Sequence, residues 1–238
     1  STLSSSSAAS DVYKRQLQLV REWAAMHGIE VRNYKEVLDI GARHPYPHVP
    51  NKDLNNLSTL CYTSGTTGLP KGVRVTTRGL LEGLEGLRWV ISDRELVSIS
   101  YLPLAHIYER GWETYVLYMG GSIGYFSGQI ERLMEDLQIL QPTVMPSVPR
   151  VLNRIAGQIQ MQMDAPGLKG KLLTKAVHAK LENYYKTGSV THALWDRLVF
   201  RKVRALLGGH VGLILTGSAP CRRDVLELLR IALCTDIR

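Results

Sequence analysis

The chain has 238 residues, of which 45% are hydrophobic and 21% charged, and its formal net charge is +8. A chain of this length and composition can bury a sizeable core, which excludes disordered and fibrous classes. The positive charge is compatible with anionic partners but selects none of them. No apolar run reaches the roughly 18 residues that a membrane-spanning helix needs, so we expect any membrane contact to be peripheral.

The cysteines are odd in number and widely spaced, at Cys61, Cys221 and Cys234. This spacing favours neither a disulfide framework nor a structural zinc site. It indicates a reducing, intracellular compartment.

The first 16 residues differ from the rest of the chain. Ser1 to Ser10 is rich in Ser and Ala and lacks the charged start and apolar core of a secretory signal. Residues 11–16 resemble a translated sequencing-library adaptor. We therefore expect residues 1–16 to be a non-native or disordered leader, followed from Leu17 by a short amphipathic helix that ends at Gly28.

From Leu57 onward, short apolar runs alternate with helical patterns, which indicates an α/β fold with a parallel sheet covered by helices. Thr77 is expected to cap a helix over residues 78–91, and a second amphipathic helix is expected over residues 130–140. The expected strands are Thr59–Tyr62, Val73–Thr76, Val97–Tyr101, Ser122–Phe126, Pro142–Met145 and Gly212–Leu215.

A long, mostly helical insert is expected between Ser147 and His210. It contains eleven lysines and arginines against three acidic residues, so its net charge of +8 equals that of the whole chain. Basic residues scattered over long helices usually form a solvated face. No nucleic-acid-binding motif accompanies them, which disfavours a nucleic-acid partner.

The residues from Thr63 to Gly72 have the composition of a phosphate-binding loop. Its glycines allow a close backbone approach to an anion, while hydroxyls, backbone amides and Lys71 can donate to phosphate oxygens. A Walker A loop is excluded because Pro70 and Gly72 flank the lysine. A flexible surface loop would explain the composition, but not its place directly after an apolar strand.

This loop resembles the signature loop of the adenylate-forming superfamily, whose members activate carboxylic acids with ATP. Residues 101–110 (Tyr-Leu-Pro-Leu-Ala-His-Ile-Tyr-Glu-Arg) resemble the second core motif of long-chain acyl-CoA synthetases. Residues 148–155 resemble a segment typical of the eukaryotic branch of that family. Residues 215–220 resemble its adenine-contacting turn. The resemblance extends from about Tyr34 to Arg238 and implies part of the large N-terminal domain of such an enzyme.

The resemblance also implies roles for individual residues. Lys71 and His106 are the candidate catalytic residues, with His106 beside the reacting carboxylate and α-phosphate, where a donor stabilises developing negative charge. A helix-start histidine is the plainer interpretation of His106. Tyr108 and Trp112 are candidates for the acyl entrance, although aromatics at this spacing are more often core. Thr63 is the candidate Mg²⁺ contact. The candidate nucleotide-binding residues are Thr63, Ser64, Gly65, Thr66, Thr67, Gly68, Lys71, Gly217, Ser218, Ala219 and Pro220.

The implied substrates are a long-chain fatty acid, ATP with Mg²⁺, and coenzyme A. Relative to that family, the chain stops before the magnesium-binding Glu segment and lacks the C-terminal lid domain. We therefore expect residues 17–238 to be a partial domain that makes no acyl-CoA alone.

Two other functions stay open. One is a different carboxylate-activating ligase, such as an aryl-CoA ligase or a peptide-synthetase adenylation domain. The other is a non-catalytic basic module that binds an anionic membrane surface.

Overall fold

The computed structural model describes residues 16–47, 53–63, 69–88, 91, 95–217 and 219–238. It divides into two compact units, Ser1–Lys52 and Asp53–Arg238. All but the last residue of the expected leader lies outside the described residues, as do Ser64 to Gly68 and Ser218. In the part of the chain that the structure describes, no helix has the length and apolarity needed to cross a membrane.

The first unit contains two helices. Residues 16–26 are helical, and the turn that follows includes Gly28 at a φ of +69°, which confirms the expected end of this helix. Helix α2, Tyr34–Arg43, begins at a capping box in which Asn33 and Glu36 each bind the other's backbone N–H. The Arg21 guanidinium lies 2.9 Å from the Glu36 carboxylate and joins the two helices.

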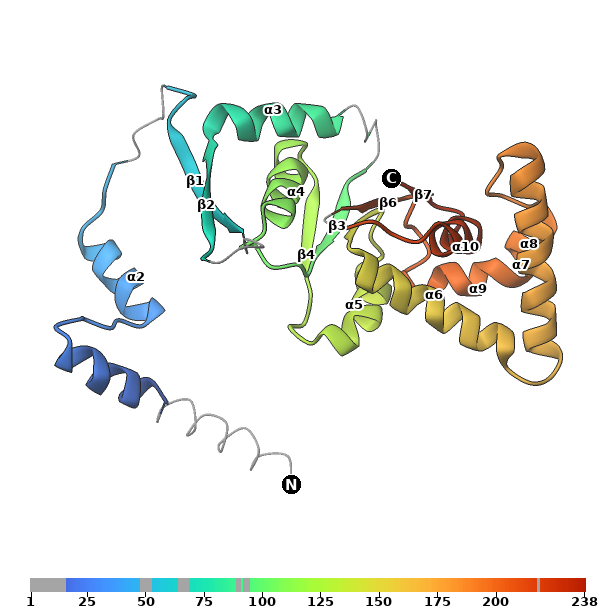
Figure 1. Ribbon diagram of the computed structural model, residues 1–238, viewed down its shortest axis with the longest axis horizontal. Helices are drawn as coiled ribbons and strands as arrows, with labels where there is room; N and C mark the ends of the chain where they lie inside the picture. The colour runs from blue at the N-terminus through green and yellow to red at the C-terminus, as the bar shows by residue number, and fades with distance from the viewer. Residues whose placement is uncertain (1–15, 48–52, 64–68, 89–90, 92–94, 218) are drawn as a thin grey trace. The chain divides into compact units, whose positions relative to one another are not determined.

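The second unit is built on a five-stranded parallel sheet with the order β4-β3-β5-β6-β7 (Figure 1). All four strand pairings are parallel. The carboxyl ends of these strands therefore lie along one edge of the sheet. The strands are β3 (Val97–Ser100), β4 (Ser122–Tyr125), β5 (Val144–Ser147), β6 (Leu213–Thr216) and β7 (Asp236–Ile237).

The strand predictions are confirmed for β3, β4 and β6 to within one residue. The prediction for β5 began two residues too early, because the pairing with β6 runs from Val144 to Ser147. The two-residue strand β7 carries no apolar run and was not predicted.

The first two predicted strands do not belong to the parallel sheet. Strand β1 (Leu57–Thr63) and strand β2 (Lys71–Thr76) form a separate antiparallel pair. The reason is length: seven residues connect them, whereas a parallel crossover needs a dozen or more. Most residues of both strands are exposed, so the expectation that the phosphate loop follows a buried strand was also wrong.

Helices α3 (Thr77–Arg88) and α4 (Ile107–Tyr118) cover one face of the sheet. Leu84 from α3 and Tyr115 from α4 pack in one cluster with Val144 and Leu213 from the strands. The Thr76 hydroxyl accepts the Gly79 N–H at 3.1 Å. The side chain that caps α3 is thus one residue earlier than the predicted Thr77.

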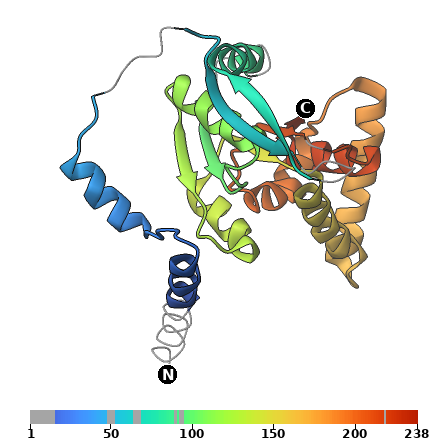
Figure 2. The ribbon, with the colours of Figure 1, turned by 60° about the vertical axis from the view of Figure 1, so that its left-hand side comes forward.

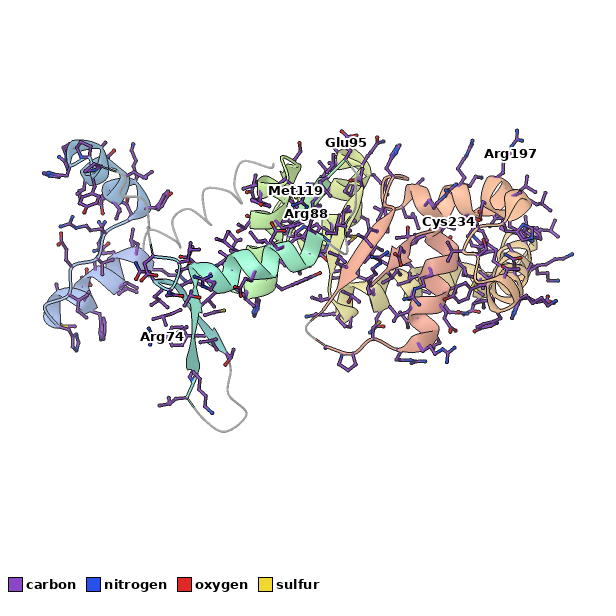
Figure 3. All side chains as sticks on the ribbon, turned by 90° about the horizontal axis from the view of Figure 1, so that it is seen from above. Arg74, Arg88, Glu95, Met119, Arg197 and Cys234 are labelled. Carbon is purple, nitrogen blue, oxygen red and sulfur yellow. The ribbon has the colours of Figure 1, made fainter. Side chains whose placement is uncertain are left out.

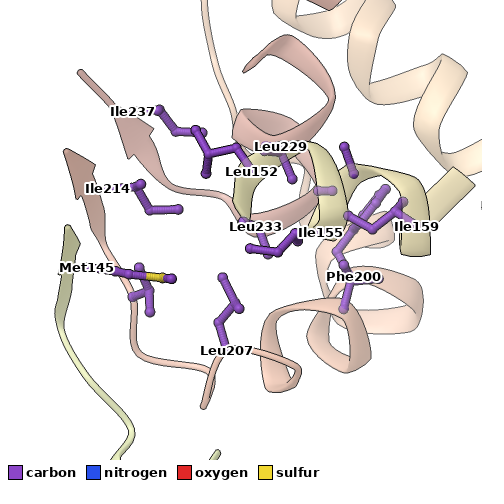
Figure 4. Packing of buried hydrophobic residues seen from close by; sticks show 14 of the residues in the cluster. Met145, Leu152, Ile155, Ile159, Phe200, Leu207, Ile214, Leu229, Leu233 and Ile237 are labelled. Carbon is purple, nitrogen blue, oxygen red and sulfur yellow. The ribbon is translucent and has the colours of Figure 1, made fainter. Parts of the chain in front are cut away.

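The helices that follow β4 pack on the opposite face, with α7 outermost, against α6 and α10 (Figures 1 and 2). Its core joins alternate strand residues such as Met145 and Ile214 to Leu152, Phe200 and Leu229 (Figure 4). The elements on this face are η1 (Ile130–Arg132), α5 (Leu133–Leu140), α6 (Pro149–Asp164), α7 (Leu168–Thr187), α8 (Ala193–Trp195), η2 (Asp196–Phe200), α9 (Arg201–Ala205) and α10 (Arg223–Leu233).

The long helical insert is confirmed by α6 to α9. Most of its basic side chains are exposed, and Figure 3 shows Arg197 extending away from the ribbon. Lys180, by contrast, is only 1% exposed, and its ammonium lies 2.5 Å from the Asp196 carboxylate. The element η2 is a π-helix, a form that is rare and often found at functional sites.

Candidate active site at the carboxyl edge of the sheet

Three of the four sequence segments that carry the resemblance follow strands of the parallel sheet. Residues 101–110 follow β3, residues 148–155 follow β5, and residues 215–220 include the end of β6. Because these strands are parallel, all three segments leave the same edge. Ligands of open α/β sheets bind at this edge.

Two tyrosine hydroxyls donate hydrogen bonds that link residues 101–110 to the ends of neighbouring strands. Tyr101 donates to the Pro146 carbonyl at 2.9 Å, which ties residues 101–110 to the end of β5. Tyr108 donates to the Leu215 carbonyl at 2.7 Å, which ties the same segment to the end of β6. Burial raises the pKa of Tyr108 to about 12 and raises the pKa of Tyr101 further. Both hydroxyls therefore remain protonated donors at neutral pH.

The β1–β2 pair is also tied to residues 101–110. The Arg110 guanidinium donates to the Thr59 hydroxyl at 2.7 Å and to the Leu104 carbonyl at 3.2 Å. The Cys61 thiol lies 3.6 Å from the Ala105 carbonyl. Residues 101–110 are therefore connected to the three strands β1, β5 and β6, from which the other three segments continue.

Thr63 and Lys71 are register partners at the end of the β1–β2 pair where the connection between the two strands begins and ends, and both are exposed. The sequence placed Lys71 in the phosphate-binding loop, but the structure makes it the first residue of β2. It forms no ion pair with any residue that the structure describes. Its ammonium is thus available to an anionic ligand.

His106 is the N-cap residue of α4, and its side chain makes no capping hydrogen bond. The ring is exposed. The position of His106 at a helix start is therefore confirmed, but its ring forms no hydrogen bond with a described residue. A histidine in this position, at the positive end of a 12-residue helix, can donate to a negatively charged substrate group.

The adenine-turn residues lie directly after β6. Gly217 packs near Tyr108, since a β-carbon placed there would lie 3.8 Å from the tyrosine ring. Ala219 and Pro220 are exposed. The Thr216 hydroxyl oxygen is buried without a hydrogen-bond partner in the described part of the chain.

Glu109 was not singled out in the sequence. Its side chain is fully buried, and neither carboxylate oxygen has a hydrogen-bond partner among the described residues. Burial raises the pKa of Glu109 to about 7, and the carboxylate of Glu113 acts in the same direction. The signal was present, because Glu109 stands three residues before the apolar Trp112 on the inner face of α4.

An apolar cavity of about 230 Å³ lies between α3 and α4. Its walls include Gly83 from α3 and Gly111 from α4, where a β-carbon would meet nothing within 4 Å, together with Ile107 and Tyr108. Trp112 touches this cavity but is only 2% exposed, and its indole N–H donates to the Ser98 hydroxyl at 2.7 Å. Trp112 is thus chiefly a core residue.

The described residues contain no group of three or more His, Cys, Asp or Glu side chains that could hold a metal ion. Thr63, the residue predicted to contact Mg²⁺, offers a single hydroxyl oxygen. Mg²⁺ is commonly held by one or two protein groups together with substrate phosphates. Thr63 therefore fits a metal that arrives on a nucleotide, but not a resident metal centre.

The family model described as "AMP-binding enzyme" matches residues 5–238. Human long-chain-fatty-acid–CoA ligase 1 is 42% identical over 217 residues, which cover 87% of this chain and 30% of the relative. The peroxisomal long chain acyl-CoA synthetase 6 of Arabidopsis thaliana is 40% identical over 209 residues, which cover 86% of this chain and 29% of the relative. The chain thus spans about 30% of the length of these relatives.

The fold matches solved adenylation domains. That of a carboxylate reductase from Mycobacterium chelonae superposes with a TM-score of 0.72 at 24% identity, over 95% of this chain and 33% of the other. That of a carboxylic acid reductase from Segniliparus rugosus, in complex with AMP, superposes with a TM-score of 0.66 at 20% identity, over 94% of this chain and 34% of the other.

Proposed function

Because the chain belongs to the AMP-binding enzyme family, we propose that the protein containing it activates long-chain fatty acids with ATP. The carboxylate oxygen attacks the α-phosphorus of ATP, the bond to pyrophosphate breaks, and an acyl-adenylate forms. The thiol of coenzyme A then attacks the acyl carbon and releases AMP. The observation that carries this proposal is the 37–42% identity to enzymes named for this activity, spread over nearly the whole chain.

We assign a separate role in the reaction to each of the connected segments. Residues Thr63 to Lys71 hold the β- and γ-phosphates, with the Thr63 hydroxyl on Mg²⁺ and the Lys71 ammonium on a phosphate oxygen. His106 donates to the carboxylate and α-phosphate as charge develops there. Residues 217–220 contact the adenine. The Tyr108 and Arg110 bonds support this arrangement, because they hold residues 101–110 between the other two groups.

The acyl chain has a candidate path in the cavity between α3 and α4. This cavity begins at Ile107 and Tyr108, next to His106, and its lining is mostly apolar. Gly83 and Gly111 keep its walls clear of side chains. A fatty acid whose carboxylate lies at His106 could place its methylene groups there.

We also propose an intracellular location and a peripheral contact with anionic membranes. The charge of the insert, which equals that of the whole chain, supports such a contact. No nucleic-acid partner is proposed.

The test is carboxylate-dependent exchange of pyrophosphate into ATP. We define the hybrid enzyme as human long-chain-fatty-acid–CoA ligase 1 in which residues 17–238 of this chain replace the matching segment. Palmitate should support exchange, whereas benzoate and leucine should not. Exchange that depends on benzoate or leucine instead would favour the other carboxylate activators. Loss of all exchange in the hybrid, with the unaltered human enzyme active in parallel, would contradict the proposal.

A further inference from the structure

The helical insert contains a second recess that the proposed reaction does not use. We call it the insert groove: about 520 Å³ between helix α7 on one side and η2 with α9 on the other, closed by the last turns of α6. It shares no lining residue with the cavity between α3 and α4. A recess of about 300–1,000 Å³ is the usual size for a small-molecule site.

The lining of the insert groove is mostly apolar. Leu173 and Val203, 7% and 4% exposed, form part of the floor and belong to the main core. Leu172 and Leu198, 48% and 59% exposed, line it from facing elements. The groove therefore presents apolar surface to water from both walls, which is the condition for binding a hydrocarbon chain.

One wall of the groove is held rigidly from beneath. Leu198 lies on the π-helix η2, whose first residue is Asp196. The Asp196 carboxylate accepts from the Lys180 ammonium at 2.5 Å and from the His192 N–H at 2.8 Å. The same ammonium lies 4.6 Å from the centre of the Phe200 ring. The wall is thus fixed before any ligand arrives.

The polar groups at the groove are mostly cationic. Lys169 reaches it from α7 and Lys202 from α9, and both are exposed. Neither forms an ion pair with a described residue, and no acidic side chain lines the groove. The two lysines stand on opposite walls of the groove, so both are candidates to contact an anion that binds there.

We propose that the insert groove binds one long-chain carboxylate anion. Its hydrocarbon chain lies along Leu172 and Leu198, and its carboxylate lies between the Lys169 and Lys202 ammonium groups. An apolar trough with paired cations matches a single-chain anionic amphiphile. A recess of this kind fits a bilayer surface less well, because a bilayer is contacted by protruding side chains. The site is independent of the proposed activation reaction.

The test uses the 238-residue chain and a palmitate that carries a photoreactive diazirine, below the concentration at which it forms micelles. After irradiation, labelled residues should fall within 162–206 on both groove walls. Unlabelled palmitate should compete, whereas its methyl ester, which lacks the anion, should compete at least tenfold less well. Labelling confined to residues 75–112, or equal competition by the ester, would overturn the proposal.

Paired variants separate the groove from the rest of the insert. Leu198→Asp should weaken palmitate binding at least tenfold, whereas Leu194→Asp, at a leucine of similar exposure outside the groove, should leave it unchanged. Lys169→Glu with Lys202→Glu should weaken binding more than Lys171→Glu with Lys175→Glu, which changes the net charge equally. Equal effects within either pair would contradict the site.

Sedimentation of the chain with phosphatidylserine vesicles, combined with no binding of monomeric palmitate, would assign the groove to a membrane surface instead.

Discussion

The Tyr108 hydroxyl donates a hydrogen bond of 2.7 Å to the carbonyl of Leu215, which lies 107 positions later in the chain. Tyr108 stands two residues after His106, and Leu215 stands two residues before Gly217. The bond therefore fixes the distance between the candidate catalytic histidine and the candidate adenine turn. Because the donor is largely buried, no water can easily replace it.

Replacement of Tyr108 by Phe should lower the free energy of unfolding by about 1 kcal/mol, because the Leu215 carbonyl loses its side-chain donor. The matched control is Tyr118→Phe on the same helix, which removes an exposed hydrogen bond to Glu85 and should cost less. Urea unfolding of the two variants measures the difference. Equal losses of unfolding free energy in the two variants would show that the Tyr108 hydrogen bond does not stabilise the carboxyl edge of the sheet.

Replacement of Glu109 by Gln should change how stability depends on pH. The pKa of Glu109 is about 7 in the folded chain and near 4.5 when unfolded, so the folded state binds the extra proton between these values. The contribution of Glu109 to stability is therefore greatest below pH 4.5 and falls as the pH rises to about 7, by roughly 3 kcal/mol at most. Glu109→Gln should flatten this fall.

The control for Glu109 is Glu131→Gln, at an exposed position of η1, which should leave the pH profile unchanged. Chemical unfolding between pH 4.5 and 8 provides the measurement. An unaltered decline in Glu109→Gln would mean that its carboxyl group does not take up a proton in this range.

Replacement of Lys180 by Met should destabilise the insert by roughly 3–5 kcal/mol, because the Asp196 carboxylate would keep its charge in a partly buried site without its cation. Burial opposes the charged form, but Lys180 and the His192 N–H together hold the pKa of Asp196 below its usual value. The double variant Lys180→Met with Asp196→Asn should recover part of the loss. Additive effects in a urea double-mutant cycle would rule out a direct interaction.

Replacement of His106 by Ala in the hybrid enzyme should separate chemistry from folding. The exposed ring makes no capping hydrogen bond, so stability should change by less than about 0.5 kcal/mol. Pyrophosphate exchange should fall by about 100-fold with little change in ATP affinity, because one donor to developing charge is lost. A stability loss with unchanged exchange would make His106 a structural residue only.

The sequence was informative wherever local pattern sets the structure. Apolar runs located β3 and β6, which are buried between helices on both faces, and also β4, a partly exposed strand at the edge of the sheet. The mostly helical character of the insert was also predicted correctly. Tyr101, Tyr108 and Arg110 link residues 101–110 to the strands from which the other three segments identified by resemblance continue. None of these three bonds could be predicted, because each depends on how distant segments meet.

The errors also have physical causes. The β1–β2 pair was placed in the parallel sheet because its residue types suit any strand, although the short connection already required antiparallel pairing. The start of β5 is set by its neighbour β6 rather than by its own residues. Glu109 was not predicted because charged side chains are seldom fully buried, whereas the inner face of α4 buries this one.

The central claim is that the Thr63–Lys71 region binds nucleotide phosphates, and calorimetric titration of ATP into the 238-residue chain tests it most directly. We predict saturable binding that Lys71→Ala weakens about ten- to a hundredfold, as expected for one charge-assisted contact. Arg74→Ala, at an exposed basic residue of the same strand, should leave the affinity unchanged. Absence of ATP binding, or equal affinities of the Lys71→Ala and Arg74→Ala variants, would contradict the account.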